Sequence, residues 1–181
     1  LRLGVAALAS LPLSQIVQPW LDQLSEQIGQ SCSVALLDET EIVYIARAAQ
    51  KRVMSIGLMP GSRLPAHCTS MGRVLLAALP REEADLLVRR SDLTPRTKFS
   101  ILDPVQTLCR IDAAREDGYA FVDQEVETGL RSIAVPLNDR KGLTVAALNI
   151  GLSSAGWTPK QTIETYLPHL LGVQSALGRV L

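Results

Sequence analysis

The sequence predicts an α/β fold of the α+β kind, in which a mostly antiparallel sheet is flanked by helices. Two pairs of segments with alternating hydrophobicity, each joined by a short polar turn, indicate antiparallel hairpins. Segments of helical periodicity lie before, between and after these pairs. The chain has 181 residues, 47% hydrophobic and 20% charged, which is enough for one domain with a substantial core.

A helix is expected within the first thirty residues, because Ile16, Trp20, Leu24 and Ile28 recur every four positions and a glycine follows them. Pro19 predicts either a kink in this helix or a late start. The next segments have a period near two. They predict a hairpin of strands at 33–37 and 42–46 and a shorter third strand at 53–56. A loop rich in Pro and Gly is expected at 57–66.

Three helices are expected in the middle of the chain. The first begins near Thr69 and the second covers 81–90, after which the chain is polar and irregular. The third is framed by Asp103-Pro104, an N-cap followed by proline at the first helical position, and by Gly118 as its stop.

The last third of the chain repeats the strand pattern and ends in a helix. Strands are expected at 119–122, 130–137 and 143–151, with a hairpin loop between the last two. The segment 158–161 has the sequence of a capping box, which predicts a C-terminal helix with a kink at Pro168. The apolar seam of this helix is expected to be Ile163, Leu167, Leu170, Leu177 and Leu181.

Charge and composition exclude several classes of function. The 18 Lys and Arg balance 18 Asp and Glu, which argues against a broad phosphate-binding surface. The apolar runs are too short for a membrane span, and the first nine residues lack the pattern of an export signal. Three widely spaced cysteines and two histidines form no metal-ligand spacing, so we expect a reducing, cytoplasmic location with no cofactor and no metal.

Two groups of residues could form a ligand site. The run Thr69 to Gly72 opens a helix after a loop, and the first amides of a helix favour an anion; the alternative is a simple Thr cap. Leu130 and Ser132 share one face of their strand, and Asn149 and Gly151 share one face of the next. These small and polar groups can line a cavity, unless Asn149 merely faces water at a strand end.

Catalysis is the weaker alternative. Cys68 lies beside His67 near a helix start, where the pKa of a thiol would fall, but no base or orienting group can be named for it. The carboxylates at 123, 125 and 127 alternate as solvated turn residues do. The sequence contains no nucleophile elbow, Walker loop or dinucleotide fingerprint, so we expect no enzyme.

Several motifs, in order along almost the whole chain, resemble the effector-binding domain of IclR-family bacterial transcription regulators. They are GSRLPAHCTSMGRVLLA at 61–77, GYA at 118–120 with DQE at 123–125, GLRSIAVP at 129–136 and ALNIG at 147–151. The runs MSIG at 54–57 and TSMGR at 69–73 are most similar to the branch that regulates protocatechuate, hydroxybenzoate and β-ketoadipate catabolism.

The resemblance implies a GAF-like effector-binding domain at 31–181, with 1–30 as the linker and helix from an N-terminal winged helix-turn-helix that this chain lacks. It implies a pocket that binds a small carboxylate of the protocatechuate, 4-hydroxybenzoate or β-ketoadipate class. It also implies a homodimer or dimer of dimers, and contact with DNA only through the missing domain. Carried over by position, the effector-binding residues are Ser70, Met71, Val122, Asp123, Leu130, Ser132, Asn149 and Gly151.

Relatives that respond to glyoxylate or pyruvate carry Cys, Ser and Ser at the positions of Ser132, Asn149 and Gly151, so the present chain departs from that pattern. The loss of a hydroxyl at Gly151 makes room for a larger effector. Three hypotheses follow: a ligand-sensing domain of a regulator, a dimerisation module with a vestigial pocket, and an enzyme based on Cys68. The first is favoured because the helix start found from the residues coincides with the family's pocket.

Overall fold

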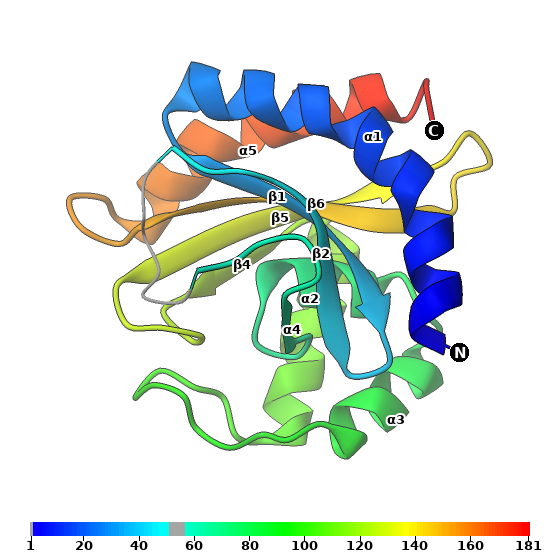
Figure 1. The fold of residues 1–181 in the computed structure, drawn as a ribbon. Coiled ribbons are helices and arrows are strands. Elements are labelled where there is room, and N and C mark those ends of the chain that lie inside the picture. Colours follow the sequence, from blue (N-terminus) through cyan, green and yellow to red (C-terminus); the bar gives the residue numbers. More distant parts are fainter. Residues whose placement is uncertain (1, 51–56) are drawn as a thin grey trace.

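The computed structural model describes residues 2–50 and 57–181, with the side chains from residue 12 onward in those ranges. The described chain forms five helices and a six-stranded sheet of order β3-β2-β1-β6-β5-β4, in which every pair of neighbours is antiparallel. Figure 1 shows α1 and α5 on one face of the curved sheet, with α2 and α4 on the other. The predicted class, a mostly antiparallel sheet flanked by helices, is therefore confirmed.

The elements agree with most of the expected ranges. The helices are α1 (Arg2–Ile28), α2 (Ser70–Ala77), α3 (Arg81–Arg90), α4 (Pro104–Asp117) and α5 (Pro159–Leu177). The strands are β1 (Ser31–Asp38), β2 (Glu41–Ala48), β3 (Arg63–Pro65), β4 (Ala120–Asp123), β5 (Leu130–Asn138) and β6 (Thr144–Ser153). The expected strand at 53–56 lies outside the described residues.

The buried side of α1 differs from the expected one. Val17, Leu21 and Leu24 are its buried apolar residues, whereas Ile16 is 37% exposed. The helix continues through Pro19 because that residue is on the exposed side, so the alternative of a late start is wrong. Gly29, at φ +64°, ends the helix and donates its amide hydrogen to the Ser25 carbonyl. The division of the chain at residue 30 stays a prediction.

A short strand replaces part of the expected loop at 57–66. β3 pairs with β2 through Ile42 opposite Leu64 and Val43 opposite Arg63. Only Leu64 of its three residues is buried, so the segment carries no alternating pattern that could have revealed it. Pro65 ends this edge strand, where the missing amide hydrogen costs no ladder bond.

Helix boundaries follow the capping signals in the sequence. The Thr69 side chain accepts from the Gly72 amide, and the Asp103 side chain accepts from the amides of Val105 and Gln106. Gly118 adopts φ +77° and terminates α4, a conformation that suits a residue without Cβ. Both bonds of the capping box at Thr158 and Gln161 are present, and α5 continues through Pro168.

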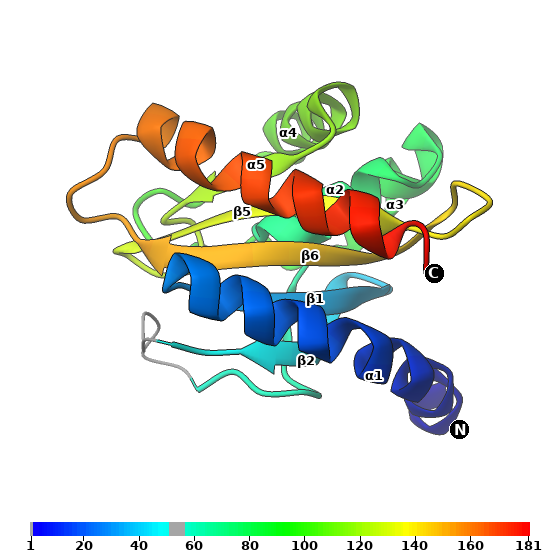
Figure 2. The same ribbon diagram turned by 90° about the horizontal axis from the view of Figure 1, so that it is seen from above.

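The sheet separates two hydrophobic cores. Figure 2 shows α1 above β1 and α5 above the β5–β6 side, and these helices enclose large aliphatic side chains. The opposite core lies between the sheet and α2, α3 and α4, and its strand residues are mostly alanines. Because alanine side chains are short, α2 lies close to the sheet with all eight of its residues buried.

Candidate functional site

Sheet register gathers polar residues on the face that carries α2. Ser33 of β1 is opposite both Arg47 of β2 and Asn149 of β6. Two residues earlier in β1, Ser31 is opposite Gly151, which is in turn opposite Ser132 of β5. Residues two apart in a strand share a face, so the two rows form one polar patch.

A β-bulge places Arg47 on this face. Val34 is opposite Ala46 but Ala35 is opposite Tyr44, so Ile45 is the extra residue of β2. Before the bulge Tyr44 faces the core under α2, whereas Ala46 after it faces α1 and α5. The change of parity returns the next residue, Arg47, to the side of Tyr44.

The start of α2 forms the opposite wall. The Thr69 hydroxyl caps the helix by accepting a hydrogen bond from the Gly72 amide. No described group accepts a hydrogen bond from the amides of Ser70 and Met71. A Cβ on Gly72 would come within 2.1 Å of the Ala66 carbonyl oxygen. Gly72 therefore allows the helix to approach its own preceding segment rather than a ligand.

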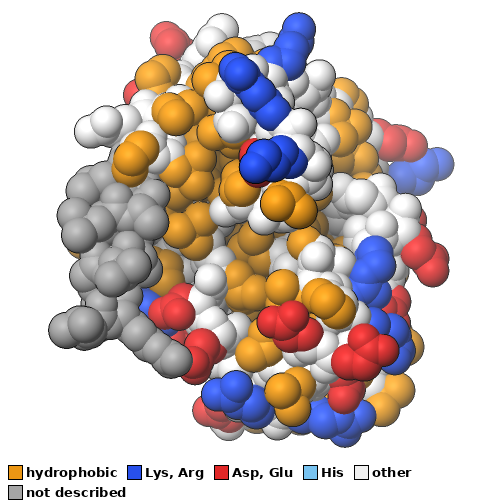
Figure 3. Space-filling model, turned by 90° about the vertical axis from the view of Figure 1, so that its right-hand side faces the viewer, with side chains coloured by type: hydrophobic (Ala, Val, Ile, Leu, Met, Phe, Trp, Pro, Cys, Tyr) orange, Lys and Arg blue, Asp and Glu red, His pale blue; other side chains and the backbone are white. Residues whose placement is uncertain are grey.

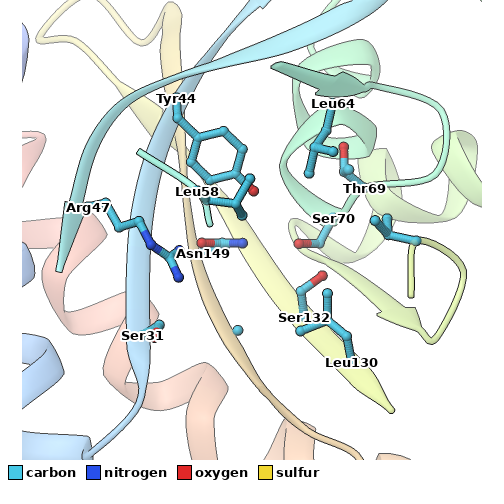
Figure 4. Close-up of a pocket in the computed structure, with 12 residues that line it drawn as sticks. Ser31, Tyr44, Arg47, Leu58, Leu64, Thr69, Ser70, Leu130, Ser132 and Asn149 are labelled. Atoms are coloured by element: carbon cyan, nitrogen blue, oxygen red, sulfur yellow. The ribbon is translucent and has the colours of Figure 1, made fainter. Parts of the chain in front are cut away.

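A cavity of about 40 Å³ joins the polar patch to the start of α2. Figure 4 shows Arg47 on one side of it, Ser70 and Ser132 on the other, and Asn149 between them. Two buried atoms that border it, Ser70 Oγ and Asn149 Oδ1, have no hydrogen-bond partner among the described residues. Buried polar atoms are almost always satisfied, so these two indicate a partner that occupies the cavity. The described lining residues are Ser31, Tyr44, Arg47, Leu58, Leu64, Thr69, Ser70, Val126, Leu130, Ser132, Asn149 and Gly151.

The site is electrically positive. Arg47 is the only charged side chain among the described residues that line the cavity. Its Nη1 donates to the Ser33 hydroxyl at 2.9 Å, and no described carboxylate lies within ion-pair distance of it. Burial raises the pKa of the Tyr44 hydroxyl to about 12, although the Arg47 charge opposes this shift. Tyr44 is therefore a neutral hydroxyl, and the arrangement suits an anionic ligand.

Five of the eight residues expected at the site line this cavity: Ser70, Leu130, Ser132, Asn149 and Gly151. Met71 and Val122 do not line it, and their side chains are buried elsewhere in the protein, at 1% and 2% exposure. Asp123 does not line it either, since its carboxylate receives a hydrogen bond from Arg131 Nε at 2.7 Å. Arg131 is tied to the Trp157 carbonyl in the segment before α5.

Sequence reasoning missed three polar lining residues, Ser31, Tyr44 and Arg47, and the apolar ones at 58, 64 and 126. Strict alternation places Tyr44 and Ala46 on one face and Arg47 on the other, so only the unforeseen bulge brings Tyr44 and Arg47 together. The available signal was a charged residue, Arg47, within the otherwise uncharged run 42–48.

The expectation that the pKa of the Cys68 thiol falls is wrong. Burial raises the pKa of this thiol to about 11, and its Sγ faces the Pro65 carbonyl at 3.9 Å. The thiol is protonated at neutral pH and is a poor nucleophile. Nor is Glu125 a solvated turn residue: it is 7% exposed, with both carboxylate oxygens on Arg73 at 2.9 and 2.6 Å.

Other site classes find no support in the described part of the chain. It contains no group of three His, Cys, Asp or Glu side chains placed to hold a metal ion. None of its helices combines the length and hydrophobicity that a membrane span requires. Figure 3 shows acidic and basic side chains intermixed around an apolar area on one side of the molecule. This distribution agrees with the zero net charge.

Comparison with known proteins gives a family match over most of the chain. Residues 5–177 match the family described as bacterial transcriptional regulator IclR C-terminal. The chain is 42% identical over 178 residues to the Pca regulon regulatory protein of Pseudomonas putida, covering 98% of this chain and 61% of that protein. It is 36% identical over 182 residues to the p-hydroxybenzoate hydroxylase transcriptional activator of Acinetobacter baylyi, covering 98% and 67%.

A solved structure agrees with these matches. The inducer-binding domain of the PobR transcription factor from Acinetobacter, a double mutant in complex with 3-hydroxybenzoic acid, superposes with a TM-score of 0.85. It is 34% identical, and the match covers 93% of this chain and 98% of that one. The present chain spans about three fifths to two thirds of the length of the curated relatives named above.

Proposed function

Because the chain belongs to the IclR family of bacterial transcriptional regulators, which are not enzymes, we propose that its pocket senses a small aromatic or dicarboxylic acid. In the whole protein, binding of this effector would modulate the affinity of an N-terminal winged helix-turn-helix domain for DNA. The protein would act in the cytoplasm as a homodimer or dimer of dimers. Differential affinity of the effector for two arrangements of the protein is what such control requires.

The Arg47 side chain is the observation that carries this proposal. A guanidinium matches a carboxylate through two parallel hydrogen bonds, and among the described residues the Arg47 side chain has a neutral hydroxyl as its partner. Ser70 Oγ and Asn149 Oδ1 border the same cavity and have no hydrogen-bond partner among the described residues. Each such unmet hydrogen bond costs about 1–3 kcal/mol. An acid with a second polar group offsets these costs.

Effector orientation follows from the two ends of the pocket. The carboxylate binds Arg47, and a hydroxyl, keto or second carboxylate group reaches Ser70 and the free amides at the start of α2. Ser132 and Asn149 bind polar atoms between these ends, and Leu130 and Gly151 border the body of the effector. Met71 contributes its amide alone. Val122 and Asp123 have no part in this arrangement.

Effector size requires the pocket to widen. A cavity near 150 Å³ holds benzene, several times the 40 Å³ present here. Leu58, Val126 and Leu130 are only partly buried and line the cavity, so their side chains can move without opening the core. The relatives regulate the Pca regulon and p-hydroxybenzoate hydroxylase, and the PobR domain binds 3-hydroxybenzoic acid, which supports an acid of this size.

Isothermal titration calorimetry with protocatechuate, 4-hydroxybenzoate and β-ketoadipate tests the proposal. At least one acid should bind, and Arg47→Met should weaken its binding about tenfold or more, because a charged hydrogen bond contributes about 1.5–3 kcal/mol. Arg47→Lys keeps the charge and should retain part of the affinity. Ser132→Leu should abolish binding by filling the cavity. If none of the acids binds or raises the melting temperature, the dimerisation module with a vestigial pocket replaces this proposal.

A further inference from the structure

Arg47 contacts two different parts of the molecule. Its guanidinium lies in the cavity and holds the Ser33 hydroxyl at 2.9 Å. Its backbone carbonyl accepts a hydrogen bond from Gln18 Nε2 of α1 at 3.0 Å, on the other side of the sheet. The same Nε2 donates to Asp22 Oδ1 at 2.8 Å, which fixes the orientation of the Gln18 amide. One residue thus joins the pocket to the helix at the N-terminal end of the chain.

The bulge divides β2 into two parts. It interrupts the ladder with β1 at Ile45, and the pairing then resumes through residues 46–48, opposite residues 32–34 of β1. On the other edge of β2, the described pairing with β3 involves residues 41–43. Among the described residues, 46–48 are therefore held by β1 and by the Gln18 bond, and the bulge separates them from the start of the strand.

Helix α1 rests on this same segment. Ala46 and Ala48 belong to the core that contains Val17 and Leu21 of α1. Both strand residues are alanines, whose short side chains do little to fix the position of the helix. The hydrogen bond from Gln18 therefore contributes a directional contact between α1 and β2. A shift of residues 46–48 changes the surface against which α1 packs.

We propose that effector capture by Arg47 loosens the hydrogen bond between its carbonyl and Gln18, and so frees α1 from the end of β2. The inference rests on the proposed function, because it takes the acid as the partner that draws the guanidinium away from Ser33. In the arrangement of the structure, the Ser33 hydroxyl holds Arg47 and Gln18 is bound to the Arg47 carbonyl. In the occupied protein the guanidinium turns to the carboxylate, and α1 is released. Gln18 touches no effector and acts as a positioning residue.

The fluorescence of Trp20 reports on α1. The chain has two tryptophans, and Trp157→Phe leaves Trp20, which packs beside Gly172 and Val173 of α5, as the single emitter. In this background 4-hydroxybenzoate should change the Trp20 emission. Gln18→Leu should shift the effector-free emission toward that of the occupied protein and abolish the further change. Its affinity for 4-hydroxybenzoate should rise about two- to tenfold, because the bond no longer has to be broken.

Gln15→Leu is the matched control, since Gln15 is an exposed glutamine one turn earlier in α1. It should respond as the parent does. Unchanged affinity or weaker binding in Gln18→Leu, or a normal Trp20 response, overturns the coupling while leaving the proposed function intact. Failure of the parent and of Gln18→Leu alike to bind any of the three acids rejects the proposed function instead.

A second measurement needs no effector. Ser33→Ala removes the hydroxyl that holds the guanidinium with almost no change in volume. If the two contacts of Arg47 are coupled, amide hydrogen exchange in residues 17–24 of α1 should be several-fold faster in this variant than in the parent. Exchange in α1 at the parental rate would overturn the inference, whichever acid the pocket binds.

Discussion

The two faces of the sheet are filled by different kinds of side chain, although the same strands supply both. Toward α1 and α5 the strands present large aliphatic residues such as Ile133, Leu148 and Ile150, all fully buried. Toward α2 they present Ala134 and Ala147, followed by the polar patch that borders the cavity. The first face supplies stability by close packing, whereas the second leaves space and unmet hydrogen bonds for a ligand.

Two arginines on the α2 side of the sheet differ in the same way, one serving the structure and the other the cavity. Arg73 of α2 is 2% exposed and fully occupied: it donates to both oxygens of Glu125 and, from Nε, to the His67 carbonyl at 2.9 Å. Among the described residues, the half-buried Arg47 side chain has one partner, the Ser33 hydroxyl. A guanidinium that already has its carboxylate is structural, and one without a described carboxylate is available for binding.

Loss of Arg73 should have the largest effect on stability. Arg73→Met leaves Glu125 buried without its cation and should lower the free energy of unfolding by about 3–5 kcal/mol. Arg47→Met should cost less, about 1.5 kcal/mol, because the half-buried guanidinium loses one described hydrogen bond, to a hydroxyl. Urea denaturation followed by circular dichroism measures both. The double variant Arg73→Met/Glu125→Leu should recover most of the loss, and equal losses in the two single variants would erase the distinction.

Neighbouring residues of β6 allow a second comparison between the faces. Ile150 is fully buried in the core beside α1 and α5, so Ile150→Ala should cost about 3 kcal/mol. At Gly151, which lines the cavity, a Cβ would meet nothing within 4 Å, so Gly151→Ala should change stability by less than about 1 kcal/mol.

Binding should show the reverse order. Gly151→Leu fills the cavity and should weaken 4-hydroxybenzoate binding at least tenfold in calorimetry, whereas Ile150→Ala should leave it within about threefold. A large loss of stability in Gly151→Ala, with normal binding by Gly151→Leu, would mean that the cavity belongs to the structural core.

Most of the fold was predictable because its boundaries depend on local chemistry. The Thr69 cap, the Asp103-Pro104 start and the Gly118 stop each act within a few residues, and the structure places helix ends at all three. β3 was missed because a strand of three residues with one buried side chain carries no periodic signal. The buried side of α1 differs from the expected one because the orientation of the helix is set by its contacts with β2 and β1 rather than by its own pattern.

The site was predictable only where strand parity is undisturbed. Ser132, Asn149 and Gly151 lie on regular parts of β5 and β6, so alternation placed them correctly on one face. Arg47 follows a bulge, and a single extra residue inverts every position after it. Asp123 was carried over from a family pattern, but its carboxylate is held by Arg131, a contact between strands that no local pattern reveals.

The last expected effect concerns His67, another buried polar residue of the α2 side. Burial, and next the charge of Arg73, lowers its pKa from 6.5 to about 4. Between these pH values the unfolded chain binds more protons than the folded one, so stability is complete above pH 6.5 and is lost as the pH falls toward 4. Between pH 7.5 and pH 5 this histidine should remove roughly 2 kcal/mol from the free energy of unfolding. His67→Gln should abolish that part of the loss in urea denaturation, while His169→Gln should retain it. If both variants lose stability as the parent does, protonation of His67 on unfolding is not the source of the loss. Burial of His67 would then not make stability depend on pH.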